Sequence, residues 1–544
     1  MKKLSLLLFF IGCAMSAMAQ RGGGAPSNQP NVNSDEQLLR TSIKELSDDS
    51  FGGRRPLSEH ENKTINYIAE KFKEAGLQPV NGSYFQDVPL LSVKTNIKGN
   101  AVTLKGKKGS LTLKNMDDIV LWTLHAEKKL KIKAELIFAG FGINAPEYGW
   151  NDYEGIDVKG KIVVVMVNDP GFYDDNLFRG KNYMTYYGRW TYKFEEASRQ
   201  GAAGCIIIHE TSAASYGWSV VQNGRTSGQL SLNSPTGNKE LVPLQGWITG
   251  EAAQKLFDIA GKPLQASLDA AKKRGFASFP LSVTTTIETN NDVVTGNSHN
   301  VVGVLPGTDL KDEYIIYSAH WDHLGIGPVV DGDSIYNGAG DNASGVAAMF
   351  VIANKFKNLP QQPRRSILFL AVTAEESGLL GSQYYSEHPL FPLKKTVVNF
   401  NMDGMGDKLR TAEVRASGGG LSKDIDRYVI EGAAMQGKPV TFSTTNQGGG
   451  FFRSDHFNFA KVGIPVVLAG GSRSLDEKAA AEHRKLWGDK STYHQPSDEY
   501  HDWWDFSGSL EDIYLYYGIG LRLANDGFFP KWDDATYKTA REKQ

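Results

Sequence analysis

The sequence contains very little cysteine. Only two of its 544 residues are cysteines, Cys13 and Cys205. Cys13 lies inside an N-terminal leader, so the mature chain would keep a single thiol. A chain with one thiol cannot form an internal disulfide. It also cannot build a metal site from several of its own thiolates.

The sequence also lacks an excess of charge of either sign and a long internal apolar run. Its 59 Lys and Arg residues nearly balance 61 Asp and Glu residues, for a formal net charge of -2. This balance gives no electrostatic reason to expect nucleic acid or an anionic membrane as a partner. No run after the leader reaches the ~18 apolar residues of a membrane span. We therefore predict neither a nucleic-acid partner nor a transmembrane span.

The N-terminus has the pattern of an export signal. A basic pair at residues 2–3 precedes an apolar stretch at 4–11 and a small-x-small cleavage site, Ala17-Met18-Ala19. We expect residues 1–19 to be removed and the protein to be periplasmic or secreted. Anchoring as a lipoprotein through Cys13 is the less favoured alternative, because Phe10 replaces the Leu usually found three places before such a cysteine.

The composition along the chain divides it into segments. Residues 20–34 are rich in Gly, Pro and Asn, which predicts a disordered lead-in. Residues 134–287 contain apolar strand-forming runs but no cluster of ligand-type side chains. Two of these runs are KGKIVVV at 159–165 and GAAGCIII at 201–208. On these two motifs the segment resembles the protease-associated domain inserted in several exported peptidases. We expect this insertion to interrupt a catalytic domain formed by 35–133 and 288–544. Its aromatic residues at 183–190 are candidates for the rim of the active site, or simply for core.

From residue 299 onward, apolar strands alternate with amphipathic helices. This alternation predicts an α/β fold with a mostly parallel, doubly wound sheet covered by helices on both faces. The expected strands are 300–305, 314–319, 366–372, 396–401 and 464–469, and the expected helices are 342–357 and 421–436.

Ionisable side chains follow several of these strands closely. His320, the pair Glu375-Glu376, and Asp403 each come just after a predicted strand. The carboxyl ends of parallel strands meet at one edge of the sheet, so we expect one shared site there. Taken alone, Asp403 is as readily a solvated acid in a turn. Together with His494, the set suits zinc and is too large for one tetrahedral ion, which indicates two metals.

Each candidate also has a local interpretation. Asp322 lies two residues after His320, so in an extended segment both project to the same side and Asp322 can accept from the imidazole. His323 falls on the opposite side and is interpreted as structural. Asp341 follows a Gly-rich turn and is either a helix N-cap or a carboxylate that bridges two metals.

Residues near the second histidine have candidate roles as well. Tyr493 is a candidate donor to an oxyanion, and Asp498 is a candidate partner for His494. Spacing alone does not distinguish which of Glu375 and Glu376 binds metal and which acts as a base. Three further residues are expected to line the site: Arg453, Asp455 and His456.

The whole motif set closely resembles the di-zinc exopeptidases, a family of aminopeptidases that also includes glutamate carboxypeptidase II and, as a divergent branch, the glutaminyl cyclases. The motifs that carry the resemblance are HWDHLG, GAGDNASG, TAEESGLLGS, NMDGMG, RSDHFNFAKVGIP and YHQPSDEY. The resemblance implies that Asp341 bridges two zinc ions. It assigns Glu376 and His494 to one ion, and His320 and Asp403 to the other. It also implies that Glu375 is the general base. Asn342, where many members have Asp, is not a ligand position.

The resemblance therefore predicts an exported aminopeptidase that hydrolyses N-terminal residues of peptides by a two-zinc, bridging-hydroxide mechanism. Two enzymatic alternatives share the scaffold: a glutaminyl cyclase, which uses one zinc, and a carboxypeptidase acting on acidic C-termini. A non-enzymatic, receptor-like binding protein is a third alternative. Such a protein would most simply be recognised by lost ligands, and none is lost here.

Overall fold

The computed structural model describes residues 32–225, 227–443, 445–488 and 491–544. The predicted signal at 1–19 and most of the predicted lead-in lie outside this part of the chain. The end of the lead-in prediction differs from the structure, because helix α1 (Val32–Leu46) already begins at residue 32. In the described part of the chain, no helix is both long and apolar enough to cross a membrane.

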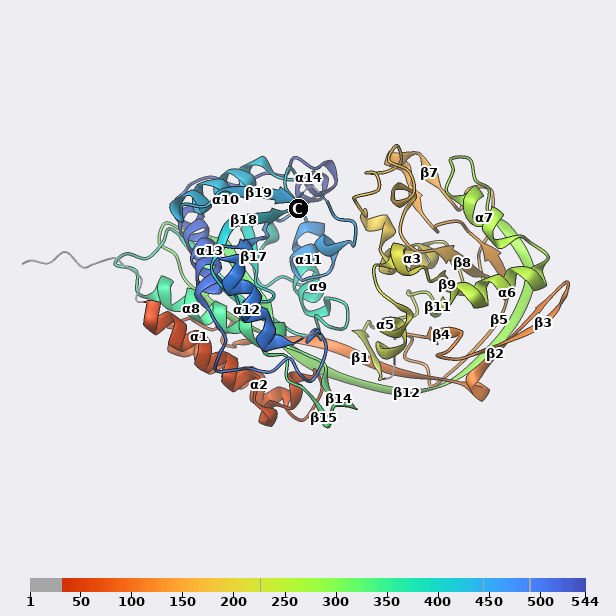
Figure 1. Ribbon diagram of the computed structural model, residues 1–544, viewed down its shortest axis with the longest axis horizontal. Coiled ribbons are helices and arrows are strands. Elements are labelled where there is room, and N and C mark those ends of the chain that lie inside the picture. The colour runs from red at the N-terminus through yellow and green to blue at the C-terminus, as the bar shows by residue number, and fades with distance from the viewer. Residues whose placement is uncertain (1–31, 226, 444, 489–490) are drawn as a thin grey trace, which may run out of the picture.

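Two lobes are joined by two long antiparallel strands (Figure 1). Strand β1 (Phe85–Ile97) pairs with β12 (Phe279–Leu305) from Phe85 opposite Val301 to Ile97 opposite Thr289. Because β12 runs through both lobes, the main sheets of the two lobes form one continuous 14-stranded sheet. The relative position of the lobes is therefore fixed partly by backbone hydrogen bonds.

The lobe that contains both ends of the described chain has the predicted α/β architecture. Its strands lie in the order β20-β17-β13-β16-β12, and all neighbours are parallel except β12 and β16. Every residue of β16 and β17 is buried, as expected for parallel strands covered on both faces. These strands are β13 (Leu310–His320), β16 (Arg365–Val372), β17 (Thr396–Asn401) and β20 (Val466–Val467).

Helices cover both faces of this sheet. Successive side chains of a strand point to opposite sides, so two neighbouring residues of β13 show what packs on each face. Tyr317 packs in a core with α1, α2, α8, α10 and α13, whereas Ile316 packs in a second core with α9, α11 and α14. These helices are α2 (Glu61–Glu74), α8 (Ser344–Lys357), α9 (Leu380–Glu387), α10 (Lys423–Met435), α11 (His456–Lys461), α13 (Ser507–Asn525) and α14 (Ala535–Glu542).

The predicted strand at 464–469 is divided in the structure. Its first part, β20, joins the main sheet, and after Leu468 the chain enters β21 (Ala469–Ser474) of a separate small sheet. This small sheet has the order β19-β18-β21. Its other strands are β18 (Thr411–Ser417) and β19 (Val440–Ser443), and the remaining elements of the lobe are hairpin β14 (Gly325–Val330) with β15 (Asp333–Tyr336), and α12 (Glu477–Trp487).

The second lobe has its own parallel strands and its own cores. Strands β5, β8, β9 and β11 are parallel, and β4 adds an antiparallel edge. The strands are β2 (Ala101–Gly106), β3 (Gly109–Lys114), β4 (Ile119–Trp122), β5 (Lys129–Phe138), β6 (Asn144–Ala145), β7 (Trp150–Asn151), β8 (Ile162–Met166), β9 (Gly204–Ile208), β10 (Gln229–Leu232) and β11 (Leu244–Ile248). The helices are α3 (Trp190–Arg199), α4 (Thr211–Ala214), α5 (Trp218–Asn223), α6 (Gly250–Ala260) and α7 (Leu264–Ala271).

The packed core of the second lobe begins before the expected boundary at residue 134. Ile97, Val102 and Leu104 pack in the same cluster as Phe138 and Phe257. The edge of this core therefore lies near the end of β1, where the chain leaves the first lobe.

The two lobes touch through the aromatic stretch that sequence patterning singled out. The backbone N–H of Met184 donates to the carbonyl of Asn446 at 3.0 Å, and the N–H of Asn446 donates to the carbonyl of Asn182 at 2.8 Å. The ring of Tyr186 packs against Phe452 and Phe457. This stretch thus gives the lobes a second contact besides the pairing of β1 with β12.

Candidate metal centre

The predicted ligands come from five separate segments of the first lobe. His320 is the last residue of β13, Glu375 and Glu376 follow β16, and Asp403 follows β17. Asp341 lies in the turn Ala339–Ala343, immediately before α8. His494 lies in the loop between α12 and α13. The carboxyl ends of parallel strands therefore deliver most of the set to one place.

Asp341 lies between the two predicted histidine ligands and presents one oxygen to each. Its Oδ1 is 3.3 Å from Nε2 of His320, and its Oδ2 is 3.4 Å from Nε2 of His494. On one side Asp403 Oδ1 is 3.5 Å from the same His320 nitrogen. On the other side Glu376 Oε2 is 3.0 Å from the same His494 nitrogen. The side chains thus form two adjacent donor groups that share Asp341.

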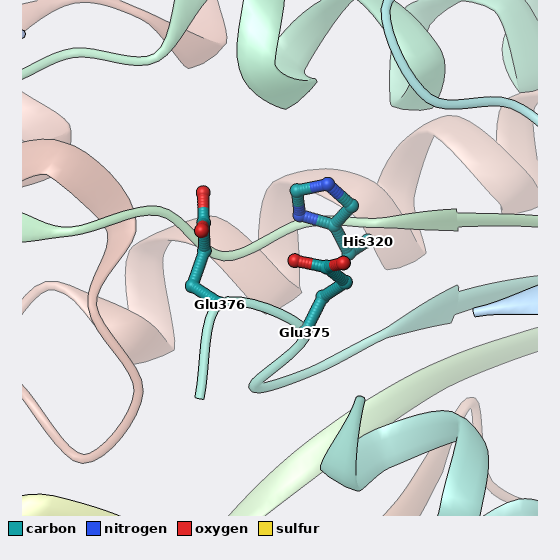
Figure 2. A group of neighbouring side chains, drawn as sticks. All are labelled: His320, Glu375 and Glu376. Atoms are coloured by element: carbon teal, nitrogen blue, oxygen red, sulfur yellow. The ribbon is translucent and has the colours of Figure 1, made fainter. Parts of the chain in front are cut away.

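Donor atoms in this cluster are close enough to hold metal ions. His320, Asp341 and Asp403 each offer an atom within 4.8 Å of the others, and so do His320, Glu375 and Glu376. Figure 2 shows the imidazole of His320 at the end of its strand, with Glu375 against it. Glu376 lies beside Glu375, and both glutamates belong to the loop that follows β16. Glu375 thus lies against His320, whereas the carboxylate of Glu376 is the one within 3.0 Å of His494.

His323 was interpreted as structural, and the structure places it at the site instead. Its Nδ1 is 2.7 Å from Oε1 of Glu376, and the side chain is fully buried. His323, Asp341 and Glu376 also form a third group with donor atoms within 4.8 Å of one another. The alternation argument failed because β13 ends at His320, so the residues after it no longer project to alternating sides.

The carboxylate of Asp322 has a different partner from the expected one. His320 Nδ1 lies 3.1 Å from the backbone carbonyl of Asp322, whereas the Asp322 carboxylate is 3.8 Å from that nitrogen. The carboxylate accepts from the backbone N–H of Glu375 at 3.0 Å. Asp322 therefore fixes the imidazole of His320 through its main chain and the loop of the two glutamates through its side chain.

Asp498 was predicted as a partner of His494, and the structure pairs it with another segment. Its two carboxylate oxygens accept from the N–H of Gly340 at 2.9 Å and of Asp341 at 3.0 Å. The turn it holds also needs Gly338, which has φ +57° and where a Cβ would overlap the ring of His323. Asp498 therefore fixes the backbone that carries Asp341.

Two polar side chains hold the loop of Asp403. Buried Asn342 donates to the carbonyl of Met402 at 3.0 Å and accepts from the N–H of Gly404 at 3.1 Å. The hydroxyl of Ser454 donates to Asp403 Oδ2 at 2.7 Å. These contacts orient Asp403 toward His320.

Of the three residues expected to line the site, Arg453 and His456 border a cavity beside Asp403. Asp455 is fully buried, and its Oδ1 accepts from the hydroxyl of Ser382 at 2.6 Å. His456 Nε2 donates to the carbonyl of Phe451 at 2.7 Å. Burial lowers the pKa of His456 to about 4, which keeps it neutral.

Tyr493 lies at the exposed edge of the predicted site. It is 67% exposed, and its ring stacks on that of His494 with centroids 3.9 Å apart. Stacking orients the imidazole of His494, and the phenol stays on the solvent side of the centre.

The charge of the cluster fits a divalent cation. Desolvation, reinforced by Glu376 and Asp403, raises the pKa of Glu375 well above its usual range. Burial lowers the pKa of His494, but Asp341 and Glu376 outweigh it and raise that pKa to about 10. Both effects show an excess of negative charge. In addition, Nε2 of His494 is buried between two carboxylates without a well-aligned hydrogen bond in the described structure. Carboxylate oxygens and imidazole nitrogens at this spacing are a donor set that suits zinc.

One protein family and several known proteins are similar in sequence to this chain. The model of Peptidase family M28 matches residues 300–517. Aminopeptidase YwaD of Bacillus subtilis (strain 168) is 27% identical over 374 residues, which are 66% of this chain and 62% of that protein. Leupeptin-inactivating enzyme 1 of Streptomyces exfoliatus is 31% identical over 232 residues, 42% of this chain and 47% of that protein. The alignment to the first of these relatives thus spans less than two thirds of its length.

A solved structure has the same fold across both lobes. The aminopeptidase from Aneurinibacillus sp. strain AM-1 is similar with a TM-score of 0.51 at 21% identity, over 91% of this chain and 95% of that one. The matched family segment contains every residue of the metal cluster described above. Residues 300–517, which form most of the first lobe, are therefore similar to Peptidase family M28.

Proposed function

We propose that this protein is an exported, zinc-dependent aminopeptidase that removes N-terminal residues from peptides. The observation that carries the proposal is the position of Asp341, whose two carboxylate oxygens each face a different histidine. A carboxylate shared in this way is how two neighbouring metal ions are held in hydrolases. The match of residues 300–517 to Peptidase family M28 supports peptide hydrolysis, and two of the relatives above carry the name aminopeptidase.

Two zinc ions per chain would each have their own ligands besides Asp341. His320 and Asp403 would hold one ion, and Glu376 and His494 would hold the other. Asp322 and Asp498 would support the two sites by fixing loops, and His323 would orient Glu376. When bound, zinc ions polarise the scissile carbonyl and acidify water enough for attack near neutral pH.

Glu375 is the group placed to move protons. It lies against His320 without a hydrogen bond from its own carboxylate to a described side chain, and its surroundings raise its pKa. A carboxylate with a raised pKa can take a proton from the attacking water and return it to the departing amine. Tyr493 stands at the solvent edge of the centre, where its hydroxyl can donate to the tetrahedral oxyanion.

A substrate panel tests the proposal directly. Purified protein is assayed with an aminoacyl-nitroanilide, an N-blocked peptide and a glutaminyl-peptide, with and without a chelator. We expect hydrolysis of the aminoacyl-nitroanilide and removal of the N-terminal Gln from the glutaminyl-peptide, and no cleavage of the N-blocked peptide. Activity should be lost with chelator and recovered on adding zinc. Release of C-terminal residues from the blocked peptide, or cyclisation of the glutaminyl-peptide, would show that an alternative reaction on this scaffold is the correct one.

A further inference from the structure

A cavity of about 800 Å³ opens beside the candidate metal centre, on the side of Asp403. Asp403 borders it and is 34% exposed, so the cavity is in direct contact with the centre. Its walls include the polar face of the small sheet, with Arg415 and Ser417 on β18. Tyr183 of the second lobe also lines it. This volume is in the range of pockets that hold a ligand larger than one side chain.

The charges around this cavity do not balance. Among the described residues that border it, Lys408 is paired with Asp512 at 2.6 Å, and Asp403 belongs to the metal cluster. Arg415 and Arg453 also border the cavity, and neither forms an ion pair with a carboxylate in the described part of the chain. Two arginines thus border a polar cavity without a carboxylate partner among the described residues.

Arg453 is held in place from across the gap between the lobes. Its Nη2 donates to the hydroxyl of Ser215, at 2.6 Å, which leaves its charge uncompensated. Arg189 of the second lobe lies close enough that burial and the charge of Arg453 together lower its pKa to about 10. Positive groups held close together at the edge of a cavity are a common arrangement for binding an anion. A guanidinium is also planar and matches the geometry of a carboxylate.

We propose that Arg415 and Arg453 bind a carboxylate group of the peptide substrate in this cavity while the N-terminal residue lies at the metal centre. This inference rests on the proposed function and names its substrate class: short peptides with a free C-terminus, or peptides with an acidic side chain near the cleaved bond. Both sources offer the same carboxylate chemistry. Arg189 raises the local positive potential from the second lobe.

The test compares peptides that differ by one carboxylate. The full-length, zinc-loaded enzyme is assayed on tri-alanine with a free or an amidated C-terminus, and on amidated peptides with Glu or Gln in the second or third position. We expect kcat/KM to be at least about tenfold higher for the carboxylate member of one or both pairs. The first pair reports a C-terminal carboxylate and the second an acidic side chain, so either preference supports the proposal.

Variants connect the preference to the two arginines. Arg415→Gln and Arg453→Gln should reduce the ratio within the preferred pair to near one, and Arg415→Glu should invert it. The matched control is Arg473→Gln, because Arg473 lies on neighbouring β21, outside the cavity lining, and should leave both the ratio and the rates unchanged. Zinc content and the unfolding curve of each variant show that it is folded and loaded.

Two results overturn the inference. One is a wild-type enzyme that hydrolyses the carboxylate and amide members of both pairs equally. The other is a preference that persists in both Arg→Gln variants. Either result leaves the proposed function standing, since all of these peptides are still cleaved. Absence of cleavage of every peptide by the zinc-loaded enzyme would instead contradict the proposed function.

Discussion

At the scale of single residues, adjacent Glu375 and Glu376 have separate surroundings, and this separation decides their roles. Glu376 contacts His323 at 2.7 Å and His494 at 3.0 Å, as a metal ligand fixed by its neighbours would. Glu375 has no such partner, and crowding by carboxylates raises its pKa. Spacing in the sequence does not distinguish Glu375 from Glu376, whereas their side-chain contacts in the structure do.

Glu375→Gln should lower kcat by roughly 10²- to 10⁴-fold and leave zinc content unchanged, because a proton carrier that does not bind metal is not needed for loading. Glu376→Gln should lose zinc as well as activity. Elemental analysis alongside kinetics measures both effects. If Glu375→Gln loses zinc and Glu376→Gln retains it, the two roles are the reverse of those proposed.

A second residue-scale prediction concerns His456, whose pKa burial lowers to about 4 in the folded protein. The unfolded chain protonates this histidine below pH ~6.5, whereas the folded chain resists protonation until about pH 4. Proton uptake therefore favours the unfolded state as pH falls through this window. The free energy of unfolding of the wild type should fall between pH 7.5 and 4.5. For His456→Asn this fall should be smaller by roughly 2–3 kcal/mol.

Urea unfolding of both chelator-treated proteins at the two pH values measures this difference. Chelation removes the pH dependence of metal binding from the comparison. Equal losses of stability in wild type and His456→Asn would mean that His456 titrates normally in the folded state.

At the scale of elements, the loops that carry the ligands matter as much as the ligands. Asp498→Asn replaces an acceptor for two backbone N–H groups by an amide whose NH₂ would face one of them. The turn that carries Asp341 should loosen, and zinc affinity should fall about 10- to 100-fold. The nearby control Asp502→Asn, at a position 87% exposed, should bind zinc as wild type does. Competition with a chromogenic chelator measures both, and equal affinities would contradict the role of Asp498.

Helices and strands with long periodic patterns could be predicted from the sequence. The strand at 396–401 matches β17, and the helix at 421–436 matches α10 within two residues at each end, because an apolar strand between turns and a regular helical face are local signals. The strand at 464–469 could not be predicted as it is, since a change of sheet at Leu468 depends on tertiary pairing. The start of α8 at Ser344 instead of Asn342 reflects the unusual turn that positions Asp341.

The candidate site shows the same limit. His320, Asp341, Glu376, Asp403 and His494 were predicted from strand ends and motif resemblance, and the structure brings them together. The contact of His323 with Glu376 could not be predicted, because side-chain direction is undefined once a strand has ended. The partner of Asp498 lies more than 150 positions earlier in the sequence, so spacing within its own motif gave no signal.

At the scale of the whole molecule, we propose that the second lobe restricts access to the centre by size. It supplies Tyr183 to the cavity wall and docks through Asn446, and no ligand of the candidate centre comes from it. Ile97 and Thr289 are directly paired, so residues 98–288 can be replaced by a two-residue Asn-Gly hairpin turn.

This deletion should keep zinc binding and change the preference between short and long peptides more than the rate on an aminoacyl-nitroanilide. Circular dichroism and zinc content serve as controls for folding and loading. An unchanged length preference in a folded, zinc-loaded deletion would refute the proposed role of the lobe. Loss of zinc from a folded deletion would show that the lobe contributes to the metal centre.

The central claim is that this chain holds two zinc ions through a shared Asp341. Elemental analysis of the purified protein, titrated with zinc after complete chelation and assayed at each step, tests it most directly. We predict two zinc ions per chain at full activity for the wild type, and at most one for Asp341→Asn, which should be inactive. Full wild-type activity with a single bound zinc ion would contradict the account.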